Sequence, residues 1–437
     1  MWKIALAILT LFLLAGTFAG CVKVASEPSE GLEYASFGNG TCALVGIGTC
    51  TDTNVMIPVK SPDGDTVVVV AEDAFAECTQ LKSVTFEEGS QVQFIEYEAF
   101  DNNKLKKVVF PDSLIYIAER AFASVKLSSC TKYKGGKYWG SASNPYMVCL
   151  WVGKELHPDT KFIVNVEEDV TLSFSSKSEL IIPEGVVGIE MRALDYENND
   201  WPKVSFPSSL TYMFFDPHSK TPSSHYTSYK DALYLGNEEN PYVIFVKATN
   251  SEAEEYTINP KTRIIAQEAF SDCVNLKSLS VPDSVVNLDI DIPYSSKVDK
   301  FELLHMGQSV MYIDQLPLMS ITSTITIPAS VKRIGRHASA DLGTIASSRS
   351  SYLVRSEIQQ MIDDGIIAIR FENQDGWYAL GTNHSPLSRG KQTEASEKCI
   401  SVQKMDSKTA TNGFKWDDYP FYIWYNAGLS AQETSNP

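Results

Sequence analysis

The chain has 437 residues, enough for roughly two or three compact domains or for one elongated repeat fold with additions. It is acidic, because 54 Asp and Glu against 37 Lys and Arg give a formal net charge of -17. No cluster of Lys and Arg stands out, which argues against nucleic acid as a partner, since affinity for a phosphate backbone requires concentrated positive charge.

The N-terminus is typical of an export signal. A short basic start precedes an apolar run over 4–20, which is short for a retained membrane span of about 20 residues. We therefore expect residues 1–20 to be a signal peptide. The run ends in Phe-Ala-Gly-Cys, which resembles the bacterial lipobox apart from Phe18 in place of the usual Leu. That resemblance implies a lipid anchor on Cys21, and an ordinary signal peptide cleaved nearby is the alternative.

Residues 21–50 are expected to form a polar tether and an N-terminal cap. Seven cysteines follow Cys21, and an odd number argues against a fully paired disulfide framework. Cys42 and Cys50 could bridge in an oxidising compartment, although a chain with this much apolar material does not require it. The absence of any C-x-x-C pair excludes a zinc ribbon.

A proline recurs in one setting through the middle of the chain. Five short apolar segments each end in a proline followed by a turn residue, and these prolines are Pro111, Pro183, Pro207, Pro282 and Pro328. Their gaps of 72, 24, 75 and 46 are close to multiples of 23 to 25, a period that indicates a solenoid. Alternating apolar residues before each proline predict a half-buried strand, which the proline ends because it lacks an N–H.

The clearest repeat units lie at 70–86, 94–122 and 264–285. They share an Ala-Phe pair, followed in two of them by Cys three residues later, then Leu and the alternating strand. We expect Ala-Phe to anchor a helical or turn segment in the core. One such coil cannot bury its own apolar face, so neighbouring coils must stack.

These residues resemble the BspA-like leucine-rich repeat family (leucine-rich repeat family 5). The resemblance covers roughly residues 50 to 340, discontinuously, and includes the segment 320–338. It implies a β-rich α/β solenoid over 51–340, a right-handed coil with short parallel strands on one face and turns or short helical segments on the other.

A larger duplication interrupts the solenoid. The hairpin-like segments near 130–170 and 216–260 match at an offset of 96 residues, because Tyr138, Gly140, Asn144, Pro145 and Tyr146 recur as Tyr234, Gly236, Asn240, Pro241 and Tyr242. Each segment predicts two strands around an Asn-Pro turn, inserted into the solenoid.

Residues 341–437 lack the repeat signature. The segment 349–370 fits a helical face through Ile358, Met361, Ile362 and Ile366. The region is either a C-terminal cap for the last coil, which solenoids need, or a small separate domain.

No reaction centre is predicted. The six histidines have no zinc-ligand spacing, and no G-x-S-x-G elbow, P-loop or complete calcium loop occurs. We therefore expect no catalytic residues, no metal site and no cofactor.

Aromatic residues are the candidate ligand contacts, because Tyr and Trp are favoured at binding hot spots. The candidates in the duplicated hairpins and near the C-terminus are Trp139, Tyr146, Tyr234, Tyr242, Trp416 and Trp424. The alternative is that strand alternation places such residues in the core.

The family resemblance implies binding rather than catalysis. We expect an adhesion or binding protein at a bacterial cell surface, lipid-anchored or alternatively secreted, whose partner is an extracellular or host protein. Membrane contact would be made only through the anchor. Two alternatives remain, a carbohydrate-binding or glycan-processing accessory lipoprotein and a passive stalk with no ligand.

Overall fold

The computed structural model describes most of the chain between Glu27 and Gly335 and several strands beyond it. The described ranges are 27–101, 104–125, 128–164, 179–190, 203–214, 225–267, 269–290, 302–315, 325–335, 369–372, 377–382, 400–404 and 422–426. No helix in these ranges is long and apolar enough to cross a membrane. The predicted signal peptide and Cys21 lie outside them.

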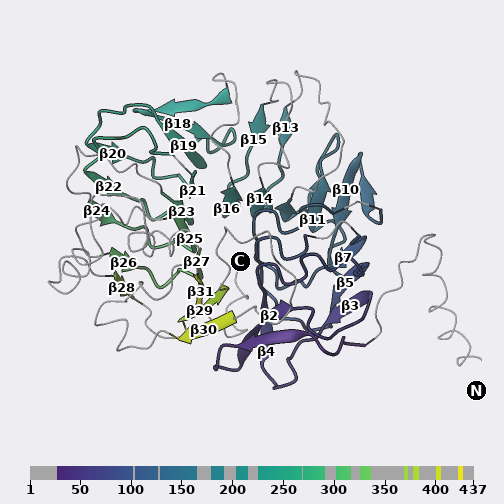
Figure 1. Cartoon of the computed structure of the whole chain (residues 1–437). Coiled ribbons are helices and arrows are strands. Elements are labelled where there is room, and N and C mark those ends of the chain that lie inside the picture. The colour runs from purple at the N-terminus through teal and green to yellow at the C-terminus, as the bar shows by residue number, and fades with distance from the viewer. Residues whose placement is uncertain are drawn as a thin grey trace, which may run out of the picture.

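One strand of each coil stacks in parallel on its neighbours at the periphery of the molecule (Figure 1). We call these stacks the outer ladders. Most of these strands are followed within three residues by a proline, which ends the pairing because it has no N–H to donate. Their strands are β3 (Asn54–Ile57), β5 (Ser83–Phe86) and β7 (Lys107–Val109); β13 (Leu180–Ile181) and β15 (Val204–Ser205); β20 (Glu255–Thr257), β22 (Ser278–Ser280) and β24 (Glu302–His305); and β26 (Ile325–Ile327) and β28 (Ile369–Phe371).

A second strand in each coil forms what we call the inner ladders, which face one another across the middle of the molecule (Figure 1). The first comprises β1 (Glu33–Ser36), β2 (Thr41–Gly46), β4 (Thr66–Val70), β6 (Phe94–Ile95) and β8 (Tyr116–Ile117). The second comprises β9 (Thr131–Tyr133), β10 (Gly136–Trp139), β11 (Val148–Trp151), β12 (Phe162–Ile163), β14 (Gly188–Glu190) and β16 (Tyr212–Phe214).

The third inner ladder is the longest. In chain order it includes β17 (Thr227–Tyr229), β18 (Ala232–Leu235), β19 (Ile244–Ala248), β21 (Ile264–Ile265), β23 (Asn287–Asp289), β25 (Tyr312–Gln315), β27 (Arg333–Ile334), β29 (Trp377–Thr382), β30 (Ile400–Lys404) and β31 (Tyr422–Asn426). Coil-to-coil pairing is parallel, as a solenoid requires, while β27 pairs with β31 antiparallel.

The segments expected to be short helices are turns, and no α-helix forms in the described ranges. The residue before Ala-Phe in three coils, Asp73, Glu98 and Arg120, has φ between 50° and 57°. A left-handed residue cannot continue a right-handed helix, so the fold there is a β-solenoid rather than α/β. The Ala-Phe pairs do anchor the core, because Phe100 stacks on Phe75 and Phe122 at 5.3 and 5.2 Å.

Each duplicated segment adds an antiparallel hairpin to an inner ladder. We call β9–β10–β11 the first hairpin element and β17–β18–β19 the second. In each, the last strand then pairs in parallel with the next coil. At Gly140 and Gly236, a side chain would collide with the backbone of the Asn-Pro turn, so both turns depend on glycine.

The chain closes into a ring. Strands β29 and β30 lie beside the N-terminal strands β2 and β4 in Figure 1, and β30 contacts β1. The ring of Phe37 lies 5.6 Å from that of Tyr378 and 6.2 Å from that of Tyr425. Of the described strands in 341–437, β29, β30 and β31 extend an inner ladder and meet the start of the solenoid, whereas β28 extends an outer ladder. Of the predicted helix at 349–370, only the last two residues are described, and they begin strand β28.

Cys42 and Cys50, the pair that could have bridged, are both buried thiols. Burial raises the pKa of Cys42 to about 12 and also raises that of Cys50. Thiols held in this neutral form are unreactive core residues.

Candidate functional site

The inner ladders meet in an aromatic cluster at the centre of the ring. Tyr116 of β8 lies 4.6 Å from Tyr212 of β16 and 5.2 Å from Tyr312 of β25, measured between ring centroids. All three are at most 2% exposed, and the Tyr212 hydroxyl accepts a hydrogen bond of 2.8 Å from the Ile117 N–H. The inward surface, which an open solenoid would offer to a ligand, is filled here by the protein's own side chains.

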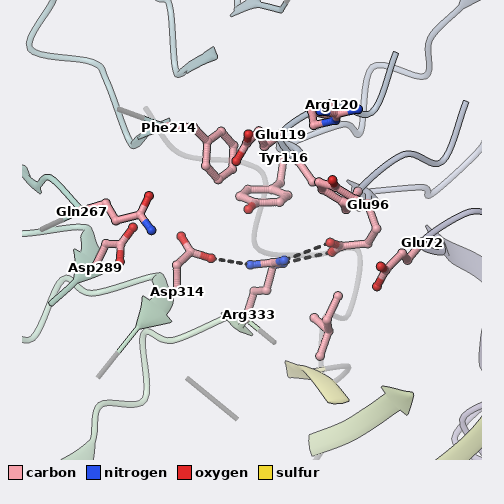
Figure 2. A pocket seen from close by; sticks show the side chains of 14 residues that line it. Glu72, Glu96, Tyr116, Glu119, Arg120, Phe214, Gln267, Asp289, Asp314 and Arg333 are labelled. Atoms are coloured by element: carbon pink, nitrogen blue, oxygen red, sulfur yellow. Dashed lines mark hydrogen bonds and ion pairs between the residues drawn. The ribbon is translucent and has the colours of Figure 1, made fainter. Parts of the chain in front are cut away.

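A buried ion pair joins the two sides of the ring beside this cluster. The guanidinium of Arg333 donates two hydrogen bonds of 2.9 Å to the Glu96 carboxylate and one of 2.6 Å to Asp314 (Figure 2). The hydroxyl of Tyr425 donates to Glu96 at 2.8 Å, and the guanidinium lies 4.5 Å from the centroid of the Tyr116 ring.

The surrounding charges keep the Arg333 guanidinium protonated. Burial by itself lowers the pKa of Arg333, but Glu96, Tyr116 and Asp314 outweigh it and raise that pKa above its ordinary value. The Arg333 and Glu96 side chains are 6% and 0% exposed. A buried charge left without its partner is strongly unfavourable, so this contact fixes how the sides of the ring meet.

A local sequence signal marked this contact. In the repeat, the position two residues after the first paired inner-ladder residue is alanine in three other coils, at Ala71, Ala118 and Ala266, whereas here it is Glu96. Further coils also carry an acid there, including Glu190 and Asp289. An acidic residue at a buried alanine position requires a cation. Its partner Arg333, 237 positions later, could not be identified from local patterns.

A cavity of about 350 Å³ adjoins the ion pair (Figure 2). The described residues that line it are rich in Asp and Glu and include no Cys, Ser, His or Lys. Its lining residues are Glu72, Glu96, Tyr97, Tyr116, Ala118, Glu119, Arg120, Phe214, Gln267, Asp289, Asp314, Arg333, Gly335 and Ile423. In the described ranges no group of three His, Cys, Asp or Glu side chains is placed to hold a metal ion.

Two of the predicted ligand-contacting residues belong to the core. Trp139 is 3% exposed, donates its indole N–H to the Ser129 carbonyl at 2.7 Å and packs edge-on against Phe122. Tyr234 is fully buried, and its hydroxyl accepts a hydrogen bond from the Asn259 N–H at 3.2 Å. Neither offers a surface to a ligand, because both faces of β10 and β18 are largely covered.

The other two hairpin candidates are partly exposed. Tyr146 stacks on His157, with centroids 3.6 Å apart and an interplanar angle of 8°, and meets Tyr133 edge-on at 6.1 Å. Tyr242 meets Tyr229 at 5.5 Å in the second hairpin element. Each hairpin element therefore presents a small aromatic group at the surface.

The remaining predicted residues lie near the C-terminus. Trp424 is in β31, where its backbone pairs with Ile334 of β27. Trp416 lies outside the described ranges, as does the predicted lipidation site Cys21.

Comparison with protein families identifies the repeats. The family described as "BspA type Leucine rich repeat region" matches in six copies over residues 53–142 and 247–350. This confirms the resemblance inferred from the sequence. No curated protein matches the chain.

Solved leucine-rich repeat structures also align with the chain at low identity. A leucine rich cell surface protein from Faecalibacterium prausnitzii is 16% identical over 72% of this chain and 92% of its own, with a TM-score of 0.25. The pneumococcal vaccine antigen PcpA is 18% identical over 72% and 79%, with a TM-score of 0.21. A leucine-rich repeat protein from Bacteroides ovatus is 15% identical over 71% and 91%, with a TM-score of 0.16. The repeats, rather than these structures, identify the architecture.

Proposed function

We propose that this chain, a protein with BspA-type leucine-rich repeats, is an exported surface protein that binds an extracellular or host protein through its hairpin elements. One observation carries the proposal. The inner ladders are filled by Tyr116, Tyr212 and Tyr312, whereas the hairpin elements leave aromatic groups partly exposed. Binding is therefore assigned to the additions rather than to the inward face. No catalytic step is part of the proposal.

Two features of the hairpin elements support a protein partner. Tyr146 and Tyr242 are rigid aromatic residues of the kind enriched at binding hot spots. Strands β9 and β17 are, among the described strands, the end strands of their sheets. An end strand has backbone N–H and C=O groups to which an extended segment of a partner can hydrogen-bond as a further strand.

Export and anchoring form the second part of the proposal. They are supported by the apolar run over 4–20 and by the lipobox-like sequence ending at Cys21. Replacing Cys21 by Ser is expected to release the protein into the medium of cells that express it. Retention of the variant in the membrane fraction would show that Cys21 is not the anchor.

The binding claim is tested with the purified protein on a panel of immobilised extracellular matrix proteins. The double variant Tyr146→Ala with Tyr242→Ala should lose binding while keeping the unfolding temperature of the parent protein. Ile181→Ala is the matched control, because Ile181 is an exposed apolar side chain of the outer ladder, 65% accessible. Unchanged binding by the double variant would refute the role of the hairpin elements.

Carbohydrate binding is the second candidate function. It is favoured by the stacked pair Tyr146 and His157 and by Trp151, whose ring lies 5.4 Å from the Lys137 ammonium. Flat aromatic faces of this kind can stack on sugar rings. Binding on a glycan array that is lost in Tyr146→Ala, without binding to any matrix protein, would favour this candidate over the first.

A further inference from the structure

Three residues on the first outer ladder occupy successive rungs at the starts of their strands. The Lys106 N–H donates to the Lys82 carbonyl at 2.8 Å, and the Lys82 N–H donates to the Thr53 carbonyl at 2.7 Å. The same rung recurs in the third outer ladder, where the Lys277 N–H donates to the Glu254 carbonyl at 2.8 Å. Lysine is thus placed at one repeat position in both ladders.

The neighbours of these lysines differ between the two ladders. Lys277 forms an ion pair with Glu254, and on the second outer ladder Lys203 pairs with Glu179 at 3.1 Å. On the first outer ladder, by contrast, the rung adjacent to Lys106 carries Lys82. Like charges on adjacent strands, about 4.8 Å apart, are mutually unfavourable. A chain with 54 acidic residues keeps two lysines together here without an acid between them.

These lysines line a hollow of about 570 Å³, a volume within the usual range of ligand pockets. The described residues that line it include three lysines and no acid. They are Thr53, Thr79, Gln80, Lys82, Lys104, Lys106 and Ser128. The Lys82 and Lys106 side chains are exposed, so their ammonium groups are accessible to a ligand. None of its described lining residues belongs to a hairpin element or lines the cavity beside the ion pair.

We infer that this hollow binds an anionic oligosaccharide that carries sulfate or carboxylate groups. The ammonium groups of Lys82 and Lys106 would contact the anionic groups. The hydroxyls of Thr53, Thr79 and Ser128 and the Gln80 amide can donate to and accept from sugar hydroxyls. These hydroxyl and amide groups beside the lysines favour a glycan, which carries hydroxyls next to its anionic groups.

Calorimetric titration with a heparin-derived tetrasaccharide tests the inference on the full-length protein. The sulfated tetrasaccharide should bind at low salt and more weakly at high salt, because salt screens exposed charges. The desulfated tetrasaccharide should not bind. The double variant Lys82→Ala with Lys106→Ala should weaken binding by about tenfold or more, since each lysine makes charge-assisted contacts.

The matched control is Lys203→Ala with Lys277→Ala, which removes the same charge from outer-ladder lysines that already have acidic partners. Unchanged affinity in this control supports the site. Equal weakening in both double variants, or no binding of the sulfated tetrasaccharide, would overturn it. A poly-glutamate peptide that binds as tightly, with the same dependence on Lys82 and Lys106, would overturn the glycan assignment.

The outcome is independent of the proposed role of the hairpin elements. Tyr146→Ala with Tyr242→Ala should leave the affinity for the tetrasaccharide unchanged. A failure of one claim therefore does not imply a failure of the other.

Discussion

The inner and outer ladders are built from the same coils but have opposite surfaces. The inner ladders carry large aromatic residues, including Tyr116 and Tyr212, that are buried because the ladders pack against one another around the ring. The outer ladders carry exposed charged residues at their strand starts, such as Lys82 and Lys277. The difference shows that closure of the ring uses the inward face for folding. Surfaces for partners are then left at the periphery and on the inserted hairpin elements.

The largest expected difference between the two regions is in their response to alkali. Burial raises the pKa of Tyr116, Tyr212, Tyr312 and Tyr425 above the ordinary value near 10. The unfolded chain loses these protons first as the pH rises. The stability that these groups contribute is therefore complete below about pH 10 and is lost as the pH rises above it.

Denaturant titrations at a series of alkaline pH values, with tyrosinate absorbance recorded in parallel, check this prediction. The buried tyrosines should ionise only as the protein unfolds. An unfolding free energy that stays constant from about pH 9 to pH 11.5 would contradict the burial of this cluster.

The second largest effect is expected from removing Glu96, the acid of the buried ion pair with Arg333. Glu96→Ala leaves the Arg333 guanidinium buried without its main partner, which should lower the free energy of unfolding by about 3 to 5 kcal/mol. Chemical denaturation measures the change. A loss below about 1 kcal/mol would place Glu96 in a solvated position, contrary to the structure.

Substitutions at Trp139 and Tyr146 compare a core residue with a surface residue of the first hairpin element. Trp139→Ala removes a buried side chain and should cost about 3 to 5 kcal/mol of stability. Tyr146→Ala removes a half-buried ring and should cost less, while affecting partner binding. Thermal unfolding of both variants checks the order, and an equal or larger loss for Tyr146→Ala would reverse our assignment.

The smallest effect is expected on the outer ladder. The Lys277 and Glu254 side chains are 54% and 62% exposed, so Lys277→Ala should change stability by at most about 1 kcal/mol. Added salt should reduce even this difference, because exposed pairs are screened. A change as large as that for Glu96→Ala would mean that the outer ladders also hold the ring together.

The coil architecture could be predicted because short sequence patterns repeat along the chain. Pro111 and Pro282 mark the ends of outer-ladder strands, and the offset of 96 residues located both hairpin elements. The inner strands were harder to recognise, since β6 and β8 contain only two residues each. Strands this short show no clear alternation.

The predictions of short helices and of two ligand-contacting residues failed for physical reasons. The short helices were wrong in the described ranges because Asp73, Glu98 and Arg120 adopt a left-handed conformation that ordinary residues rarely take. Trp139 and Tyr234 were candidate ligand contacts because Tyr and Trp are favoured at binding hot spots, with burial in the core as the alternative. Both faces of β10 and β18 are instead largely covered by neighbouring coils, so alternation could not separate core from surface.

Ring closure could not be predicted from repeat spacing. It depends on contacts such as that between Glu96 and Arg333, which are separated by 237 positions. Periodicity specifies how one coil stacks on the next but not how far the stack curves. Glutamate at position 96, where three other coils have alanine, indicated a buried charge but did not identify Arg333 as its partner.

A double-mutant cycle on Glu96→Gln and Arg333→Met tests ring closure most directly. Both substitutions preserve approximate size, and the coupling energy isolates the interaction between the two side chains. If the ring is closed, the unfolding free energies should show a coupling of about 1 to 3 kcal/mol. A coupling of about zero would mean that the two sides of the solenoid do not meet and that its inward face is open.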